Sequence, residues 1–578
     1  MLIEHFPIQP RCGACGDSIR RLERVVALRS NQDATVYAET TRPFLFPPYG
    51  TASLTLLDER LICRRDDCGA CAQTPELVTV HYDCYHIFIA CSKEALNLEE
   101  DKAVERLWTL SLYRNPWPKA ELICFVETHI DLSALPRLAG IADLPQLTRL
   151  PVELVMMIRK FSLHELFWRS ISVIALSSRP LSPLSISKLP LNHVLSWKRG
   201  EPLLLTPYPQ TPPFVRITID IEGICQVERP HEPTPFTGET FNELAFFVNR
   251  VANTSQIYVK VKDNRLRLCL PENLTGLATW NTDNPPAPST LLDTRSLSPI
   301  QNGYWQLCAF DLNRCFGVSF FLSFGQLFGV YVHRSDDSGA ADAYRRACES
   351  RRRMVWIYMP ISPDDQVTVL GCRLTDRGFN ILARMDLAGE VILGRLGVRT
   401  TQDRLLGYGT PLTLIYGEPT GQQRVPVIGT RHGTSGRDRL PAPFSMQDFR
   451  PDVDDAYFSW APLDSIQSIR SFYDKDTGLC RGLIFQYENG GLRAVGECRK
   501  HVDDDVLAVK PSVICFQPAP NLASWRAPEA IGVRVELGND IDHKHKGEGW
   551  ECLRIGHGVL TFSFTEDSSS ISHRSQLP

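Results

Sequence analysis

Two short motifs near the N-terminus constrain this chain more than any other feature. Cys12-Gly-Ala-Cys15 places two thiols at the spacing of a tight turn, and His81-Tyr-Asp-Cys84 supplies an imidazole and a third thiol. Structural zinc sites hold the metal tetrahedrally with four ligands of this kind, and Gly13 helps the first turn to close tightly. We therefore predict that Cys12, Cys15, His81 and Cys84 form one structural zinc site.

The residues after the second motif favour a helix start. His81 and Cys84 precede an apolar run from Tyr85 to Ile89. Free amide groups and the helix dipole at a helix N-terminus stabilise a thiolate. The ligand pattern resembles treble-clef and LIM-type zinc modules, and this resemblance implies a closed, structural metal site.

A second group of potential ligands lies between the two motifs. Cys68-Gly-Ala-Cys71 repeats the sequence of the first turn, and Cys63 precedes it. We predict a possible second zinc site from Cys63, Cys68 and Cys71, with His86 or Cys91 as the fourth ligand. The alternative is that these are reduced cysteines on a loop. Closed ligand sets leave no position for water, so either site would contribute to folding and not to catalysis.

The bulk properties exclude several classes of protein. The chain has 62 basic and 66 acidic residues and a formal net charge of −4, so no basic face for nucleic acid is expected. No secretory signal is visible, and the most apolar window, 161–176, is too short and too charged to cross a membrane. We expect a cytoplasmic or nuclear protein. Seven of its 18 cysteines lie in the first 91 residues and are candidate metal ligands, and the others are expected to be reduced, buried thiols.

The length of 578 residues requires several domains. The fold class we predict is α+β multidomain, with a small zinc-binding module, a short helical pair and a large antiparallel β-rich body, sandwich or prism-like. The predicted domains are the zinc module with a C-terminal helix at 1–118, the helical pair at 140–200, a β-rich domain at 201–429, and its continuation at 452–578.

The β-rich body contains a loose internal repeat. Residues 466–496 and 367–394 each have the pattern of three strands joined by tight turns, and 316–330 is a shorter version. Such repetition favours a pseudo-symmetric prism or sandwich. The outline of 466–496 is similar to jacalin-like lectins, which implies sugar binding as an alternative role.

Residues 148–174 form the pattern of two helices. Leu154, Met157, Ile158 and Phe161 recur at helical spacing and define one apolar stripe, and Pro151 suits the first helical turn. Ser162 and Glu165 have the form of a capping box, which predicts that a second helix starts there.

Leu150-Pro151-x-Glu153-Leu154, followed by Ile158, resembles the opening of an F-box, the helical module that docks substrate receptors onto a ubiquitin-ligase adaptor. The resemblance implies that Leu150, Pro151, Leu154 and Ile158 face the adaptor. The alternative is a helical hairpin whose apolar stripe packs on the β-rich body. The order of CxxC, HxDC, LPxEL and β-rich parts also resembles uncharacterised multidomain fungal proteins.

Familiar catalytic motifs are not found in the sequence. It contains no Gly-x-Ser-x-Gly elbow and no phosphate-binding glycine loop. Asp542-His543-Lys544-His545 is interpreted as a solvated loop, and Trp550 as a packing residue. We therefore expect a non-catalytic protein-interaction protein with protein partners. The F-box resemblance implies that it is a substrate receptor that binds the F-box adaptor. The alternative is a carbohydrate-binding or enzymatic β-domain protein.

Overall fold

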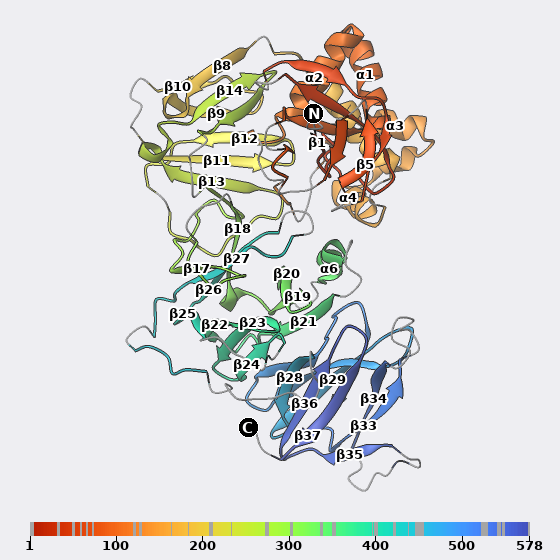
Figure 1. The fold of residues 1–578 in the computed structure, drawn as a ribbon, viewed down its shortest axis with the longest axis vertical. Helices are drawn as coiled ribbons and strands as arrows, with labels where there is room; N and C mark the ends of the chain where they lie inside the picture. Colours follow the sequence, from red (N-terminus) through yellow and green to blue (C-terminus); the bar gives the residue numbers. More distant parts are fainter. Residues whose placement is uncertain are drawn as a thin grey trace. The chain divides into compact units, whose positions relative to one another are not determined.

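The fold is that of a computed structural model of the chain (Figure 1). It describes residues 5–575 except 32–34, 49–51, 58–59, 65–67, 72–73, 119–122, 126–129, 163–164, 183, 207–211, 233, 272–276, 301–304, 336–338, 349–353, 396, 398–402, 420–422, 437–438, 445–455, 522–529, 540–544 and 546–548, with the side chains of 52–57 also left out. The chain divides into two compact units. Unit 1 is Met1–Pro235 with Glu239–Pro285, and unit 2 is Phe236–Gly238 with Pro286–Pro578.

Unit 1 begins with two small sheets and two helices. The first sheet has the order β1-β6-β5, and in the second β2 pairs with β3, β4 and β7. Helices α1 and α2 follow directly after β7. The bounds are β1 His5–Pro7, β2 Arg24–Ser30, β3 Tyr37–Thr40, β4 Phe44–Leu45, β5 Ala52–Leu57, β6 Arg60–Cys63, β7 Leu77–His81, α1 Tyr82–Leu96 and α2 Glu100–Leu112.

The predicted helical pair is present, and a short helix precedes it. These helices are α3 Leu135–Ile141, α4 Val152–Phe161 and α5 Leu166–Ser177. Ser162 does not act as the predicted N-cap. Its hydroxyl donates to the Ile158 carbonyl at 2.7 Å and so closes α4, while Glu165 is the N-cap residue of α5 without a side-chain capping bond. The bond to the preceding turn competes with capping of the next helix.

The remainder of unit 1 is β-structure. Strands β15, β14 and β8 form one sheet, and β10, β9, β12, β11, β13 and β16 follow one another in a second. The bounds are β8 Ser185–Pro190, β9 Val194–Lys198, β10 Leu204–Leu205, β11 Phe214–Asp220, β12 Gly223–Glu228, β13 Ala245–Arg250, β14 Tyr258–Lys262, β15 Arg265–Cys269 and β16 Ala278–Trp280.

Unit 2 contains antiparallel sheets around one large apolar core. The sheet orders are β18-β26-β27-β17, β20-β19-β21, β24-β23-β22-β25, β28-β36-β37, and β32-β29-β30-β34-β33-β35 with β31 paired to β30. The bounds are β17 Thr290–Asp293, β18 Trp305–Asp311, β19 Gly317–Ser323, β20 Gln326–His333, α6 Ala341–Cys348, β21 Val355–Pro360, β22 Val367–Thr375, β23 Gly378–Met385, β24 Gly389–Leu393, β25 Arg404–Tyr408, β26 Thr413–Gly417, β27 Val427–Arg431, β28 Tyr457–Pro462, β29 Ile466–Tyr473, β30 Cys480–Tyr487, β31 Leu492–Gly496, β32 Asp504–Val509, β33 Val513–Pro520, β34 Ile531–Gly538, β35 Glu551–Arg554, β36 Val559–Phe564 and β37 Ser569–Arg574.

The predicted α+β multidomain class, with antiparallel β-rich structure, is confirmed. The predicted three-stranded segments are β29-β30-β31 and β22-β23-β24, each a meander of antiparallel neighbours. The predicted zinc module and helical pair both lie in unit 1, and the predicted domain 201–429 is divided near residue 285. Side-chain bonds join these segments of unit 1, because Arg106 of α2 donates to Asp263 at 2.9 Å and Arg267 of β15 pairs with Glu76.

Candidate metal centres and helical docking surface

The first predicted ligand set comes together in unit 1. Cys12, Cys15, His81 and Cys84 are all buried, and their ligand atoms lie within 4.8 Å of one another. His81 Nδ1 lies 3.5 Å from Cys15 Sγ and 3.7 Å from Cys84 Sγ. The His81 backbone N–H donates to Cys12 Sγ at 3.4 Å. Three sulfurs and one nitrogen at these separations can surround a single metal ion.

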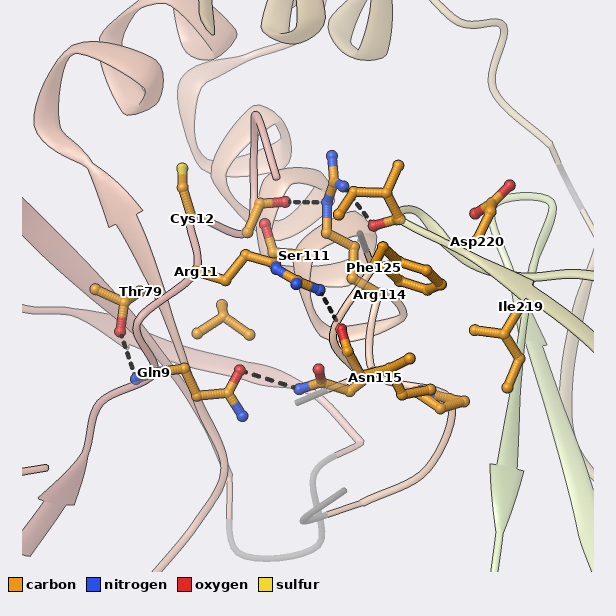
Figure 2. Close-up of a pocket in the computed structure, with 15 residues that line it drawn as sticks. Gln9, Arg11, Cys12, Thr79, Ser111, Arg114, Asn115, Phe125, Ile219 and Asp220 are labelled. Atoms are coloured by element: carbon orange, nitrogen blue, oxygen red, sulfur yellow. Dashed lines mark hydrogen bonds between the residues drawn. The ribbon is translucent and has the colours of Figure 1, made fainter. Parts of the chain in front are cut away.

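The turn at Cys12–Cys15 is fixed by its surroundings on two sides. The Gly13 N–H donates to the Thr79 carbonyl of β7 at 2.8 Å. Arg114, just after α2, donates to the Gly13 carbonyl at 2.6 Å (Figure 2). It also donates to the Ala14 carbonyl at 2.6 Å. A Cβ at position 13 would lie 2.5 Å from Cβ of Ser111, so only glycine lets the turn approach α2 this closely.

The other two ligands stand at the start of α1. His81 is the last residue of β7 and the N-cap of α1, and Cys84 lies in its first turn. The predicted helix start is therefore confirmed, and a second helix, α2, follows α1. Asn97, at the C-cap of α1, adopts the left-handed conformation and separates the two helices.

Electrostatics at this cluster favour a bound cation. Burial acts to raise the pKa of Cys12, but hydrogen bonds with Cys15 and Cys84 and the charge on His81 bring it well below its usual value. Burial and the neighbouring thiols raise the pKa of Cys15, and the hydrogen bond with Cys12 raises the pKa of Cys84. A divalent ion at this cluster would stabilise the thiolate forms of all three cysteines.

A carboxylate supports the histidine ligand. Glu23 Oε2 lies 3.1 Å from His81 Nε2, the ring nitrogen that faces away from the cysteines. Burial acts to lower the pKa of His81, but the Cys12 thiolate and Glu23 raise it to about 9. Carboxylate partners of this kind fix the orientation of metal-binding imidazoles.

The second cluster has a different fourth ligand from the one predicted. Cys63, Cys68 and Cys71 gather with His5, whose Nδ1 lies 3.2 Å from Cys68 Sγ. Strand β1 brings His5 there, because it pairs in parallel with β6 and places Pro7 opposite Cys63.

His86 and Cys91 are not part of that cluster. Both belong to α1, where His86 is exposed and packs against the rings of Tyr82 and Tyr85, at centroid distances of 4.4 and 5.3 Å. Cys91 is buried in the apolar cluster beneath α5. The prediction of His86 as a ligand fails because the helix turns its ring away from the cysteines.

The second cluster also contains a readily ionised thiol. Burial acts to raise the pKa of Cys68, but hydrogen bonds from the Cys71 backbone and from the side chains of Cys71 and His5 lower it to about 6. Burial and the neighbouring Cys63 raise the pKa of Cys71. As in the first cluster, a cation would stabilise the remaining thiolates.

A pocket beside Cys12 is lined by polar side chains that form hydrogen bonds with other residues of the chain (Figure 2). Arg11 Nη1 donates to the Ile123 carbonyl at 2.8 Å, and its guanidinium lies 5.8 Å from the centre of the Phe125 ring. Asn115 Nδ2 donates to Gln9 Oε1 at 3.3 Å. These bonds engage the polar side chains of Gln9, Arg11 and Asn115 within the walls of the pocket.

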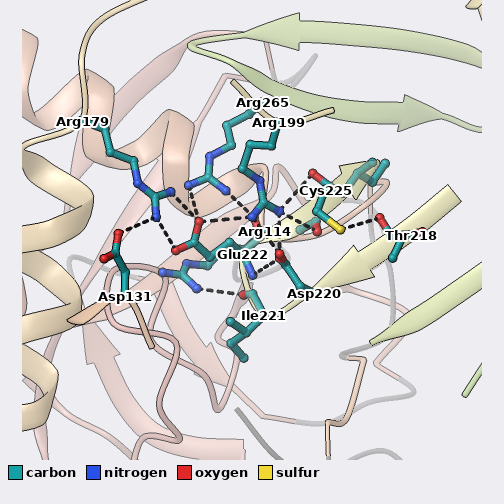
Figure 3. Close-up of polar contacts among 12 residues, drawn as sticks. Arg114, Asp131, Arg179, Arg199, Thr218, Asp220, Ile221, Glu222, Cys225 and Arg265 are labelled. Atoms are coloured by element: carbon teal, nitrogen blue, oxygen red, sulfur yellow. Dashed lines mark hydrogen bonds and ion pairs between the residues drawn. The ribbon is translucent and has the colours of Figure 1, made fainter. Parts of the chain in front are cut away.

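A partly buried ionic network adjoins the second hydrogen-bonding contact of Arg114 (Figure 3). Arg114 Nη1 donates to the Ile221 carbonyl at 2.8 Å, in the turn between β11 and β12. The next residue, Glu222, pairs with Arg179, Arg199 and Arg265. Burial acts to raise the pKa of Glu222, but Arg265, Arg179 and Arg114 lower it well below its usual value. The network is structural, since its charges compensate one another.

Helix α4 presents its predicted apolar stripe outward. Leu154, Met157 and Phe161 are 44%, 54% and 85% exposed, and Ile158 is also exposed. The opposite face of the helix is buried through Val155 at 1% and the arginine Arg159 at 5%. Among the predicted adaptor-facing residues, Pro151, Leu154 and Ile158 are exposed, and Leu150 packs partly against the apolar cluster around α5.

Two ion pairs connect the helical pair to the first metal centre. Arg159 of α4 lies 3.6 Å from Asp17, which follows the Cys12–Cys15 turn. Arg169 of α5 lies 3.3 Å from Glu23, the carboxylate that supports His81. These ion pairs therefore link α4 and α5 to residues that neighbour the metal ligands.

A pocket in unit 2 is the best candidate for the alternative, enzymatic role. Its lining includes Asp474, Arg481, Glu497 and Glu566. Arg481 pairs with both Asp474 and Glu497, and Glu566 pairs with Arg395. Carboxylates committed to arginines in this way are stabilised as anions and are poorly placed to exchange protons.

Comparisons with known proteins do not assign the chain to a family. No protein-family model matches the chain, and no curated protein matches it either. Among the described residues, the helices are all too short or too polar to span a lipid bilayer.

Sequence reasoning missed three contributors to the first two centres. His5 is 58 positions before Cys63, and Glu23 and Arg169 come from a loop and a helix with no ligand motif. The parallel pairing of β1 with β6 brings His5 to its cluster, the pairing of β2 with β7 brings Glu23 to His81, and the packing of α5 beside α1 brings Arg169 there.

Proposed function

We propose that this is a non-catalytic protein-interaction protein that docks onto a partner through helix α4. The observation that carries the proposal is the orientation of α4. Its apolar stripe faces solvent while a charged residue, Arg159, occupies the buried face. A surface helix normally has the reverse arrangement, and exposed apolar stripes mark surfaces that a partner covers.

The spacing of the exposed side chains suits recognition of a helix in a groove. Leu154, Ile158 and Phe161 follow one another at i, i+4 and i+7, the positions that anchor an amphipathic helix in an apolar groove. Val152, at the start of α4, is also exposed, as are Ile141, Leu144 and Leu166 on the flanking segments of unit 1.

The partner we propose is the F-box adaptor of a ubiquitin ligase. The support is that Pro151, Leu154 and Ile158, the residues that the F-box resemblance assigns to adaptor contact, are exposed. Under this proposal unit 2 is available to recognise a target protein. The proposal rests on the exposed apolar face of α4 and on the LPxEL motif.

We also propose that the two clusters of unit 1 bind zinc. Both ligand sets, Cys12/Cys15/His81/Cys84 and His5/Cys63/Cys68/Cys71, are Cys₃His, a composition typical of structural zinc. The first centre would fix the loop that carries Asp17 and the histidine supported by Glu23. Zinc there stabilises the platform on which α4 and α5 rest.

Co-purification with the adaptor tests the docking proposal. Wild-type protein should retain the adaptor, and Leu154→Asp should lose it, because a carboxylate cannot enter an apolar groove. Leu440→Asp is the matched control, since Leu440 is 77% exposed and lies in unit 2. Thermal unfolding of each variant separates lost binding from lost folding.

Two results would contradict the proposal. The first is failure of wild-type protein to retain the adaptor under conditions that retain it on a known F-box protein. The second is Leu154→Asp binding as well as wild type.

A further inference from the structure

A third group of potential metal ligands lies in unit 2, where no CxxC motif exists. Cys515 on β33 and Cys552 on β35 are directly opposite each other in antiparallel pairing. Glu536 on β34 is opposite Cys515 on its other side. Directly paired residues point to the same face of a sheet. Two thiols and one carboxylate therefore form a row across three neighbouring strands.

His545 completes this row. The ligand atoms of Cys515, His545 and Cys552 lie within 4.8 Å of one another, and His545 Nε2 lies 3.6 Å from Glu536 Oε2. The His545 ring stacks on Trp550 with centroids 3.9 Å apart and planes 8° apart, which fixes its orientation. The tryptophan predicted as a packing residue thus holds a ligand in place.

We propose that Cys515, Cys552 and His545 bind a zinc ion, whose fourth position is taken by water or by the nearby carboxylate of Glu536. Two sulfurs with one imidazole select a thiophilic ion such as Zn²⁺ over Mg²⁺ or Ca²⁺. The site differs from those in unit 1 because Cys552 and Glu536 are exposed while Cys515 is buried. Its weakest donor, the carboxylate, faces solvent, so it can be replaced by water or by a donor from a bound molecule.

This site could not be predicted from the sequence for two reasons. Cys515 and Cys552 are 37 positions apart, and their approach results only from the pairing of β33 with β35. His545 belongs to the segment interpreted above as a solvated loop, whose members Asp542, His543 and Lys544 lie outside the described residues.

Zinc content of the full-length protein tests the proposal. Protein prepared in reductant with excess zinc and then dialysed should contain one zinc equivalent more than Cys552→Ser and His545→Ala. Cys348→Ser is the control, because Cys348 on α6 is partly buried and outside every cluster. With Co²⁺ in place of zinc, the same two variants should lose one equivalent of tetrahedral thiolate–cobalt absorption.

Equal zinc contents in wild type, Cys552→Ser and His545→Ala would overturn the proposal. So would a Cys515–Cys552 disulfide in protein handled with reductant, detected as an intact mass lower by two hydrogens. Because Cys552 is exposed, Cys552→Ser should unfold at the same temperature as wild type without metal. The result is independent of adaptor binding, since the protein donors all belong to unit 2.

Discussion

Truncation of two adjacent residues on α4 should affect the free energy of unfolding and partner binding in opposite orders. Val155 is 1% exposed and Leu154 is 44% exposed. Val155→Ala removes two buried methyl groups, at roughly 0.8 kcal/mol each, and leaves a cavity, so unfolding should become easier by about 2–3 kcal/mol. Leu154→Ala removes a larger group but should cost less than about 1 kcal/mol, because much of that group already contacts water.

Partner binding should show the reverse order. Leu154→Ala removes an anchor of the proposed interface and should weaken adaptor binding by about tenfold or more, equivalent to about 1.4 kcal/mol. Val155→Ala should change affinity by less than about twofold, provided the protein is folded. Urea unfolding followed by tryptophan fluorescence measures the stability, and titration calorimetry with purified adaptor measures the affinity.

The reasoning is refuted if Leu154→Ala proves the more destabilising variant and binding is unchanged. That result would mean that the apolar stripe packs within the protein in solution.

Three further predictions concern charged groups. Glu23→Gln should weaken zinc binding at the first centre by roughly 10–100-fold, and unchanged affinity in a chelator competition would contradict its support of the histidine ligand. Glu222→Gln should destabilise unit 1 by about 3–5 kcal/mol in urea unfolding, because it leaves three arginines without their shared anion; a loss below about 1 kcal/mol would contradict this. Burial acts to raise the pKa of Asp474, but the hydrogen bond and charge of Arg481 lower it to about 2. Its folded pKa is therefore below its unfolded value, so its stabilisation is complete above about pH 4 and is lost between about pH 4 and pH 2. Asp474→Asn should remove that part of the pH dependence, and an unaltered acid limb of the stability curve would count against it.

The parts of the metal centres that are local in sequence could be predicted, and the rest could not. Cys12 with Cys15, and His81 with Cys84, form turns whose spacing alone indicates ligands. His5 required knowledge that β1 and β6 pair in parallel, a contact that no local pattern encodes. His86 was a reasonable alternative by spacing, but the rotation of α1 directs it to solvent.

The helical pair shows a similar limit. The stripe of Leu154, Met157, Ile158 and Phe161 is periodic, so the sequence predicts the helix and its apolar face. Periodicity does not indicate whether that face packs in the interior of the protein or lies exposed as a binding surface. The decisive information is the burial of Val155 and Arg159, which depends on contacts with α5 and with Asp17.

Some strands of unit 2 could be predicted from the sequence because their residue pattern is local. Residues 466–496 alternate β-branched and aromatic residues with tight turns, and they fold as β29, β30 and β31. The pairing order across the larger sheet, in which β34 lies between β30 and β33, depends on contacts distant in sequence.

X-ray absorption at the zinc edge tests the central claim most directly. The Cys552→Ser variant should be used, because it leaves only the two Cys₃His centres of unit 1. The account predicts an average shell of three sulfurs at about 2.3 Å and one nitrogen at about 2.0–2.1 Å for each zinc. A shell made mainly of oxygen and nitrogen, or no bound zinc, would contradict it.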